Sequence, residues 1–472
     1  MSRRQKSRKR RNLTPRAPKK QAAPVRTGNK WLLPLLGVVS AGIIALLIVN
    51  PFSRPTDPVP DREDPRAIEW PDPLTVEALT QEVEDIVTRV LDAYPRDPDS
   101  HALMGRLRYL QGQRKEAERS WERCLELDPN RADIYDALAE AAWEEGDFEK
   151  TAAAYRQALR IDPTMPGVQV RLGRSLLELG QIEEAIAVME KAVSRSDSGH
   201  YYLAQAYMQS KAYEKARDSY LRAVEKHPDN AQAYYGLALA SMRLGQTEKA
   251  RQYQEAFRKY GVEDPESVKA RKRRPKQLSG LAQERSITAN ACTGAADVYR
   301  NHGNLRQAER LWQTAAVIDP NNSVSREELL ALYEHSGRLE DARTFFEQLT
   351  QMSSKNAWDY FHLGSLCTLL NRRDEAEQAY LNVTRLNPDQ PEGYEALVQL
   401  YLTTGWKLSE SKAFASRAAE LRPSPQNYFL LAQVCTKIGD RADALAALEQ
   451  ALKMDPVNVP YRRLYDELRK AG

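Results

Sequence analysis

Residues 97–130 read DPDSHALMGRLRYLQGQRKEAERSWERCLELDPN, and this stretch shows the plan of most of the chain. It predicts an apolar helix that carries a small residue, Gly105, followed by a turn at Gly112 and a second helix that Pro129 ends. One face of the second helix would carry Ala117, Trp121 and Cys124. A small residue lets two crossing helices approach closely, and glycine at the turn permits a left-handed backbone. The stretch therefore predicts a helix–turn–helix unit.

The unit recurs with a fixed period. Glycines stand 34 residues apart at Gly112, Gly146 and Gly180, at Gly303 and Gly337, and at Gly405 and Gly439. Asn371 occupies the step between the last two pairs. Ala308, Ala342 and Ala376 repeat in phase with them. The period predicts ten units, five from about Pro98 to Gly261 and five from about Ala289 to Asn458.

This residue order resembles the tetratricopeptide repeat family, whose unit is a 34-residue helix–turn–helix. The resemblance covers about three quarters of the chain. It implies an all-α fold, a right-handed α-solenoid of about ten units with an extended concave face. It also implies a protein or peptide partner.

The departures from the period set the expected boundaries. The third unit is three residues short, and the second helix of the ninth falls one residue late. Residues 76–93 resemble the second helix of a half unit that caps the start. We therefore expect a first sub-array at 76–261, a basic insert at 262–288, a second sub-array at 289–458 and a closing helix at 459–472.

The resemblance implies that the first helix of each unit lines the concave face. Carried over unit by unit, the candidate partner-binding residues are Tyr201, Gln205, Met208, Tyr235, Leu239, Met242, Arg243, Trp358, Phe361, Phe429 and Gln433, with Asn290, Asp297, Arg300 and Thr368 also facing inward. Aromatic side chains give a large contact area at low entropy cost, and methionine adapts to varied shapes. The cluster from Tyr201 to Met242 is the strongest candidate for a peptide-binding patch. Packing between units is the alternative role for it.

The insert carries a run of basic residues, KARKRRPK. Its charges are Lys269, Arg271, Lys272, Arg273, Arg274 and Lys276. They would suit an acidic partner or phosphate groups, or form a solvated surface loop. We do not expect a nucleic-acid partner, because no aromatic residues interleave these charges.

The N-terminal region has a different character. Residues 1–30 hold twelve basic side chains and no acidic one, so the remainder of a chain of net charge +4 carries −8. Residues 31–49, WLLPLLGVVSAGIIALLIV, contain no charge and would span roughly 28 Å as a helix. The pattern predicts a disordered cytoplasmic tail at 1–30, an uncleaved transmembrane signal anchor at 31–49 and a proline-rich linker at 50–75. A cleaved signal peptide and a buried core helix are the alternatives.

Flanking charge sets the expected orientation. The basic tail places the N terminus in the cytoplasm and the repeats across the membrane, in the periplasm or its equivalent. We therefore expect a single-pass membrane protein whose array is extracytoplasmic.

The sequence lacks a recognisable catalytic constellation. It has no glycine-rich phosphate loop and no paired His or Cys at metal-ligand spacing. Cys124, Cys292, Cys367 and Cys435 fall at positions that pack against neighbouring helices, where cysteine acts as a small apolar residue. We expect no enzyme activity, metal, cofactor or small-molecule substrate.

Together these patterns predict a membrane-anchored scaffold that binds proteins or extended peptides on its concave face, in the assembly of an envelope complex. Three alternatives remain open. One is a cytosol-facing membrane receptor or co-chaperone, another is an accessory subunit that recruits substrates to an enzyme. In the third, the cationic tail tethers nucleic acid or lipid.

Overall fold

The computed structural model describes residues 75–194, 199–261, 276–353 and 355–470, all of which belong to one compact unit that spans residues 68–472. These residues form 22 α-helices and no strand. In chain order they are α1 (Val76–Ala93), α2 (Pro98–Leu110), α3 (Arg114–Leu127), α4 (Ala132–Glu145), α5 (Phe148–Ile161), α6 (Val168–Glu178), α7 (Ile182–Val193), α8 (His200–Gln209), α9 (Tyr213–Lys226), α10 (Ala231–Arg243), α11 (Thr247–Gly261), α13 (Lys276–Asn301), α14 (Leu305–Ile318), α15 (Ser323–His335), α16 (Leu339–Met352), α17 (Ala357–Leu369), α18 (Arg373–Leu386), α19 (Glu392–Thr404), α20 (Leu408–Leu421), α21 (Pro425–Lys437), α22 (Arg441–Met454) and α23 (Val459–Lys470).

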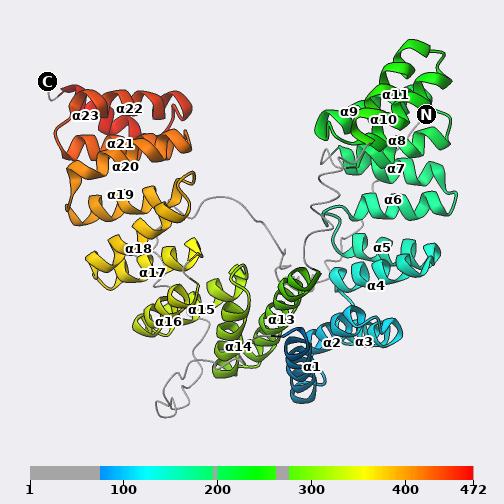
Figure 1. Ribbon diagram of the computed structural model, residues 1–472, viewed down its shortest axis with the longest axis horizontal. Coiled ribbons are helices and arrows are strands. Elements are labelled where there is room, and N and C mark those ends of the chain that lie inside the picture. Colours follow the sequence, from blue (N-terminus) through cyan, green and yellow to red (C-terminus); the bar gives the residue numbers. More distant parts are fainter. Residues whose placement is uncertain (1–74, 195–198, 262–275, 354, 471–472) are drawn as a thin grey trace, which may run out of the picture. The chain divides into compact units, whose positions relative to one another are not determined.

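The helices pair along the chain as the 34-residue period predicts. α2 packs on α3, α4 on α5, and so on to α11, and the same pattern runs from α13 and α14 to α21 and α22 (Figure 1). Within each sub-array every pair also packs on the next, so that an apolar layer continues between units. The expectation of an all-α solenoid of repeat units is therefore confirmed.

Small residues sit where the two helices of a unit cross. A Cβ atom on Gly105 would clash with the indole of Trp121, and one on Gly173 would clash with Met189. Gly364 has the same relation to the ring of Tyr380. In each case a large side chain of the second helix occupies the space that the glycine leaves, so the pair can approach closely.

The turns within the units use the left-handed backbone. The glycines at the period positions have φ between 68° and 82°, at Gly112, Gly146, Gly180, Gly303, Gly337, Gly405 and Gly439. Asn371, which replaces glycine at one step, has φ 58° and belongs to a residue type that tolerates this region. A tight left-handed turn therefore sets the direction of each second helix.

Two of the expected irregularities can be located at turns with a left-handed residue other than glycine. Lys211, 31 residues after Gly180, takes the turn position of the fourth unit with φ 62°. In the ninth unit Lys407, also left-handed at φ 47°, precedes α20 as an extra residue after Gly405 and Trp406. That insertion delays the second helix by one residue.

The start of the second sub-array differs from the expected boundary. α13 begins at Lys276, so residues 276–288, assigned from the sequence to the insert, continue as helix into the second sub-array. The extension is helical because it has something to pack on: Leu281 and Ile287 contact apolar clusters that include side chains of α1. Glu284 also accepts a hydrogen bond from Thr80 of α1, over 3.1 Å.

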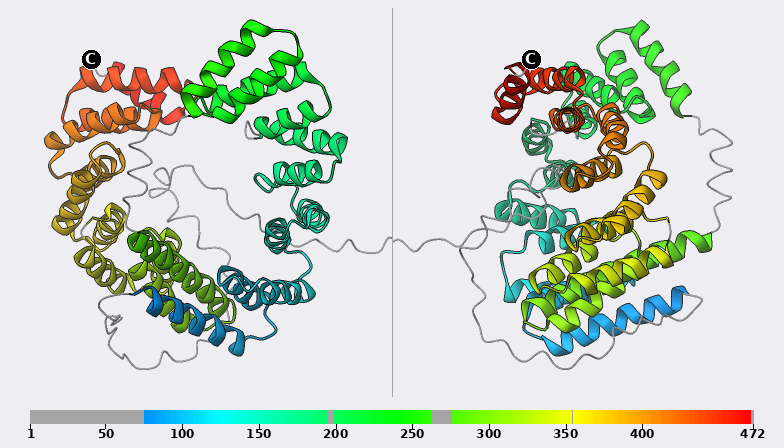
Figure 2. Two further views of the ribbon diagram at one scale, coloured as in Figure 1. Left: turned by 45° about the vertical axis from the view of Figure 1, so that its right-hand side comes forward. Right: turned by 90° about the vertical axis from the view of Figure 1, so that its left-hand side faces the viewer.

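α1 therefore joins both sub-arrays. Its residues Leu79, Ile86 and Val90 pack with Ala295 and Trp312 of α13 and α14. Its other apolar residues, Val83 and Val87, pack with Met104 and Leu107 of α2. Both figures show α1 beside α13 (Figure 1, Figure 2). The half unit expected to cap the first sub-array also completes the second.

The four cysteines are all buried and free. Cys124, Cys292, Cys367 and Cys435 each have 0% exposure, and the first three belong to apolar clusters formed with neighbouring helices. Burial raises the pKa of the Cys124 and Cys367 thiols to about 11 in each case. Their expected structural role is confirmed.

The expected localisation is contradicted. None of the helices that the structure describes is long and apolar enough to cross a membrane. The longest of them, α13, carries Glu284, Arg285, Asp297 and Arg300. The single-pass, extracytoplasmic arrangement is therefore wrong by this measure, and the envelope role that depended on it gains no support. Residues 1–30, 31–49 and 50–74, on which it rested, lie outside the described residues.

Candidate functional site

A hollow of about 640 Å³ lies across the first helices of three successive units. Most of its lining residues are aromatic or carry amides, and four are tyrosines. We call it the tyrosine groove. Its lining is Arg174, Leu177 and Glu178 of α6, Tyr201, Tyr202, Gln205, Met208 and Gln209 of α8, Tyr220 of α9, and Gln232, Tyr235, Gly236 and Leu239 of α10.

Five residues chosen from the sequence meet in this groove. They are Tyr201, Gln205, Met208, Tyr235 and Leu239. Two more from the same cluster, Met242 and Arg243, lie farther along α10 and are not part of the lining. Met242 is 56% exposed, and its sulfur lies 3.8 Å from Nε2 of Gln254. The structure thus gathers most of the expected patch on one surface.

Tyr201 has a double role. Its ring meets the rings of Tyr202 and Tyr220 edge-on, at centroid distances of 5.1 and 6.0 Å. Gln205 donates a hydrogen bond from Nε2 to the Tyr201 hydroxyl over 3.0 Å, which leaves the hydroxyl proton free to be donated. Burial raises the pKa of Tyr201. Packing between units and lining of the groove are therefore both functions of this side chain.

Close approach of α9 and α10 forms the floor of the groove. A Cβ atom on Gly236 would clash with the ring of Tyr220, which is only 4% exposed. Tyr235 and Leu239 stand on the same helix and keep 48% and 36% of their surface exposed. Tyr235 also contacts Phe257 of α11 at 5.5 Å between ring centroids. A rigid buried ring thus supports exposed apolar side chains.

Arg174 is the only basic residue of the lining. Its guanidinium carbon lies 4.8 Å from the ring centroid of Trp143 and 4.6 Å from that of Tyr202. The guanidinium group is therefore held between two aromatic faces, an arrangement that fixes its position.

The residues that the third unit contributes to the groove were not among the candidates chosen from the sequence. Arg174 and Leu177 occupy the positions in the third unit that Gln205 and Met208 occupy in the fourth, 31 residues later. Because the third unit is short by three, the equivalence appears only when that shorter step is used. Tyr202 gave no periodic signal. Tyr220 repeats in phase with Trp121 and Tyr155, but the period marked that position for packing between helices and not for the groove.

The candidates of the second sub-array do not join the tyrosine groove. Trp358 is 58% exposed and meets Phe361 at 5.7 Å. Phe429 packs on Tyr461 of the closing helix α23, at 4.6 Å. Gln433 lies one turn farther along α21. Phe429 therefore serves packing between helices, whereas Trp358 is an exposed ring that, among the described residues, contacts only rings of its own helix, Phe361 and His362.

The remaining sequence candidates are placed as follows. Asp297 and Arg300 form an ion pair on α13 at 2.9 Å, and burial raises the pKa of Asp297 to about 6. Of the basic run, Lys276 begins α13, while Lys269, Arg271, Lys272, Arg273 and Arg274 lie outside the described residues. The docking role expected of this run stays a prediction.

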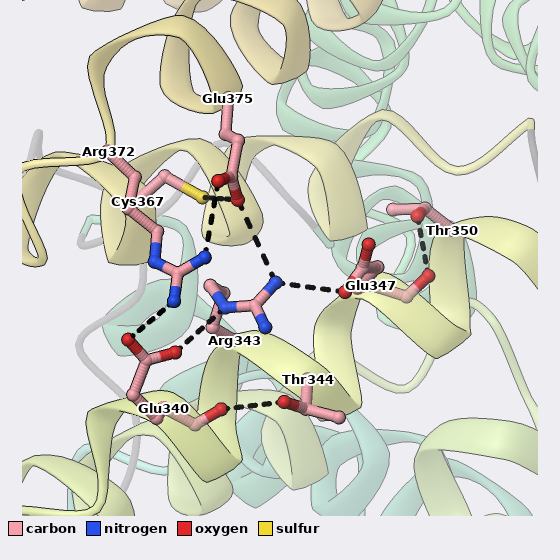
Figure 3. Close-up of polar contacts among 8 residues, drawn as sticks. All are labelled: Glu340, Arg343, Thr344, Glu347, Thr350, Cys367, Arg372 and Glu375. Carbon is pink, nitrogen blue, oxygen red and sulfur yellow. Dashed lines mark hydrogen bonds and ion pairs between the residues drawn. The ribbon is translucent and has the colours of Figure 1, made fainter.

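Charged residues link successive units on their second helices, as Figure 3 shows for α16 and α18. Arg343 pairs with Glu340 and Glu347, each at 2.9 Å, and reaches Glu375 of α18 at 3.8 Å. Arg372 pairs with Glu340 at 2.9 Å and with Glu375 at 3.2 Å. These groups are largely open to solvent, which screens their charges, so the pairs add little to stability.

A second hollow, of about 530 Å³, lies beside this network. Its lining is Asn371, Arg372, Arg373, Asp374, Glu375 and Trp406. Arg372 is already paired with two carboxylates, and the lining also holds Arg373 together with Asp374 and Glu375, so its charged groups are balanced in sign. The tyrosine groove is the better candidate for a partner site.

One ion pair is fully buried. Arg326 of α15 donates to Asp359 of α17 over 2.6 Å, and their side chains are 3% and 1% exposed. The guanidinium also donates to the carbonyl oxygens of Ala316 and Asn322, each over 2.9 Å. The N–H groups of the guanidinium are all hydrogen-bonded. These bonds compensate for the loss of water and allow the charged pair to be buried.

The described part of the chain contains no cluster of side chains that could bind a metal ion. No group of three or more His, Cys, Asp or Glu side chains lies close enough to hold an ion there. What the groove offers is aromatic surface, amide groups and hydroxyl groups, which suit binding.

Family models match the repeats directly. Models described as tetratricopeptide repeat or TPR repeat match residues 102–166, 142–206, 204–245, 293–357, 360–390 and 425–458, which together cover more than half of the chain. The chain belongs to the tetratricopeptide repeat family. The matched segments include α6, α8 and α10, the helices that line the tyrosine groove.

Comparisons with single proteins give weaker likenesses. Mouse Superkiller complex protein 3 is 24% identical over 273 residues, which are 55% of this chain but only 16% of that protein. A solved structure of YrrB, titled a TPR protein with an unusual peptide-binding site, is 17% identical, covers 39% of this chain and 97% of its own, and has a TM-score of 0.35. A MamA structure from Desulfovibrio magneticus is 18% identical, with 39% and 95% coverage and a TM-score of 0.31. At these levels no function is transferred.

Proposed function

We propose that this chain is a scaffold that binds an extended peptide segment of a partner protein in the tyrosine groove. The observation that carries the proposal is the convergence of Tyr201, Gln205, Met208, Tyr235 and Leu239 on one hollow. A surface that serves only to pack units would bury its apolar side chains. Tyr235 and Leu239 instead remain 48% and 36% exposed beside it.

The geometry of the groove supports a segment of chain as the ligand. It runs across α6, α8 and α10, one helix from each of three units, so a ligand must be long enough to reach all three. Exposed aromatic and aliphatic groups supply most of the binding free energy of such sites, and the polar rim fixes the register.

A matched pair of leucines provides the test. Leu239 is 36% exposed and lines the groove, whereas Leu221 is 39% exposed on α9 and does not line it. We expect Leu239→Glu to abolish binding of the full-length chain to an immobilised peptide library, because the charge is desolvated under a ligand. Leu221→Glu should bind as the wild type does.

Helical circular dichroism of both variants checks that the array remains folded. Equal binding by the two variants would show that peptides bind elsewhere, and the proposal would then be abandoned.

A further inference from the structure

The composition of the tyrosine groove restricts the chemistry of its ligand, and this inference rests on the proposed function. We propose that the ligand is an uncharged, proline-rich segment of a partner protein, bound as a polyproline II helix. Four properties of the groove lead to this choice: its helical walls, its free donors, its charge and its crossed rings.

The walls exclude binding by strand addition. The groove is made by α6, α8, α9 and α10, whose backbone groups are bonded within the helices, so it has no free strand edge to pair with a peptide backbone. The N–H groups of an extended ordinary peptide would lose water without gaining backbone partners, which is unfavourable. Proline has no N–H, so a proline-rich segment avoids much of that loss.

Several polar groups of the groove can donate hydrogen bonds to carbonyl oxygens. The Tyr201 hydroxyl accepts from Gln205 and keeps its own proton to donate. The amides of Gln209 and Gln232 also line the groove. A polyproline II segment has no internal hydrogen bonds, so its carbonyl oxygens are available along its whole length. An α-helical ligand would present free carbonyls only at its last turn.

The charge of the groove favours a neutral ligand. Its only strongly charged groups are Arg174 and Glu178, which are of opposite sign. The Arg174 guanidinium is stacked between Trp143 and Tyr202. A strongly acidic or basic segment would lose its hydration here without an opposing cluster of charge.

The rings are arranged to receive compact, rigid side chains. Tyr201 meets Tyr202 edge-on, with an interplanar angle of 76°, and Tyr220 edge-on, with an angle of 60°. Aromatic-lined grooves of this kind bind proline-rich segments, whose conformation is largely set before binding, so that little entropy is lost on association.

The test compares three labelled peptides by fluorescence anisotropy with the full-length chain. The first alternates proline with alanine and leucine over about twelve residues, which span ~37 Å as polyproline II. The second replaces every proline by alanine, which favours an α-helix, and the third keeps the prolines but replaces the leucines by glutamate. We expect the first peptide to bind at least about tenfold more tightly than either of the others.

Groove variants separate the two proposals. Leu239→Glu and Tyr235→Ala should each weaken binding of the proline peptide about tenfold or more, while Leu221→Glu should leave it unchanged. If the alanine or glutamate peptide binds as tightly as the first, and Leu239→Glu abolishes that binding, the ligand class is wrong but the groove is still the binding site. If Leu239→Glu leaves all peptide binding intact, both proposals are overturned.

Discussion

Single residues at the turns decide how each unit is held together. Gly180 and Lys211 occupy equivalent turn positions in successive units, with φ 70° and 62°, although only glycine adopts this region without strain. The array therefore tolerates a strained lysine at the end of α8, where the unit spacing is shortened. Each turn requires a left-handed backbone conformation at this position. Residues other than glycine can occupy the position, but they lower the stability of the chain.

Exchanging the residue types at these two turns should change stability in opposite directions. Lys211→Gly should stabilise the chain by about 1 kcal/mol, because it removes left-handed strain, and Gly180→Ala should destabilise it by a similar amount. A Cβ atom on Gly180 would have no neighbour within 4 Å, so the second change introduces no steric clash. Urea unfolding followed by circular dichroism measures both. Shifts of the same sign would contradict this account.

His362 should make stability depend on pH. Burial, and secondarily the charge of Arg326, lowers the pKa of His362 to about 4 from an ordinary value of 6.5. The unfolded chain therefore binds the proton more readily than the folded chain. As far as His362 is concerned, the free energy of unfolding is greatest above pH 6.5 and decreases as the pH falls toward 4. The loss should be on the order of 3 kcal/mol, since a pKa difference of one unit corresponds to about 1.4 kcal/mol.

His362→Phe keeps an aromatic ring beside Phe346, which lies 5.2 Å away between centroids, and removes the titrating group. Unfolding free energies of the two proteins, measured between pH 4 and pH 7, should converge or cross as the pH rises. The difference isolates His362 from groups of opposite effect, such as Asp297, whose pKa burial raises to about 6. Parallel pH profiles would show that His362 does not contribute.

At the scale of elements, α1 is the helix whose loss should affect the most distant parts of the chain. Val90 is 0% exposed and belongs to the cluster of α13 and α14. Val90→Asp should destabilise this cluster by several kcal/mol, because it buries an unpaired carboxylate. Hydrogen exchange should then accelerate in α13 and α14, and also in α2, which packs on the same helix.

Asp92→Ala, at an exposed position of the same helix, is the control and should leave exchange unchanged. If Val90→Asp accelerated exchange in α2 and left α13 protected, α1 would be only the cap of the first sub-array that the sequence predicted.

At the scale of the whole molecule, the sequence predicted the residues that recur in each unit but not the contacts that join distant units. Gly105 with Trp121, and the turn glycines with Asn371, could be read because each unit repeats them in phase. The same phase led to Tyr201 and Tyr235, and with the shorter step it would have led to Arg174. Phase carries no information about contacts between distant units, so the pairing of α1 with α13 could not be read from it.

Side-chain contacts between neighbouring units were also hidden. The partners Arg326 and Asp359 are 33 residues apart, close to one period, but this spacing alone does not indicate that two charged residues meet. Which of them pair depends on burial and rotamer, and these are set only once the helices have packed.

The pairing of α1 with α13 has a consequence for synthesis on the ribosome. About 180 residues separate the two helices, and at ~5–20 residues per second the ribosome needs roughly 10–40 s to translate them. During that interval α2 can pack on Val83 and Val87. The residues Leu79, Ile86 and Val90 still lack their packing partners, because α13 and α14 have not yet been synthesised. The nascent chain therefore exposes this apolar stripe until α13 has been synthesised. During that time we expect a cotranslational chaperone to shield it.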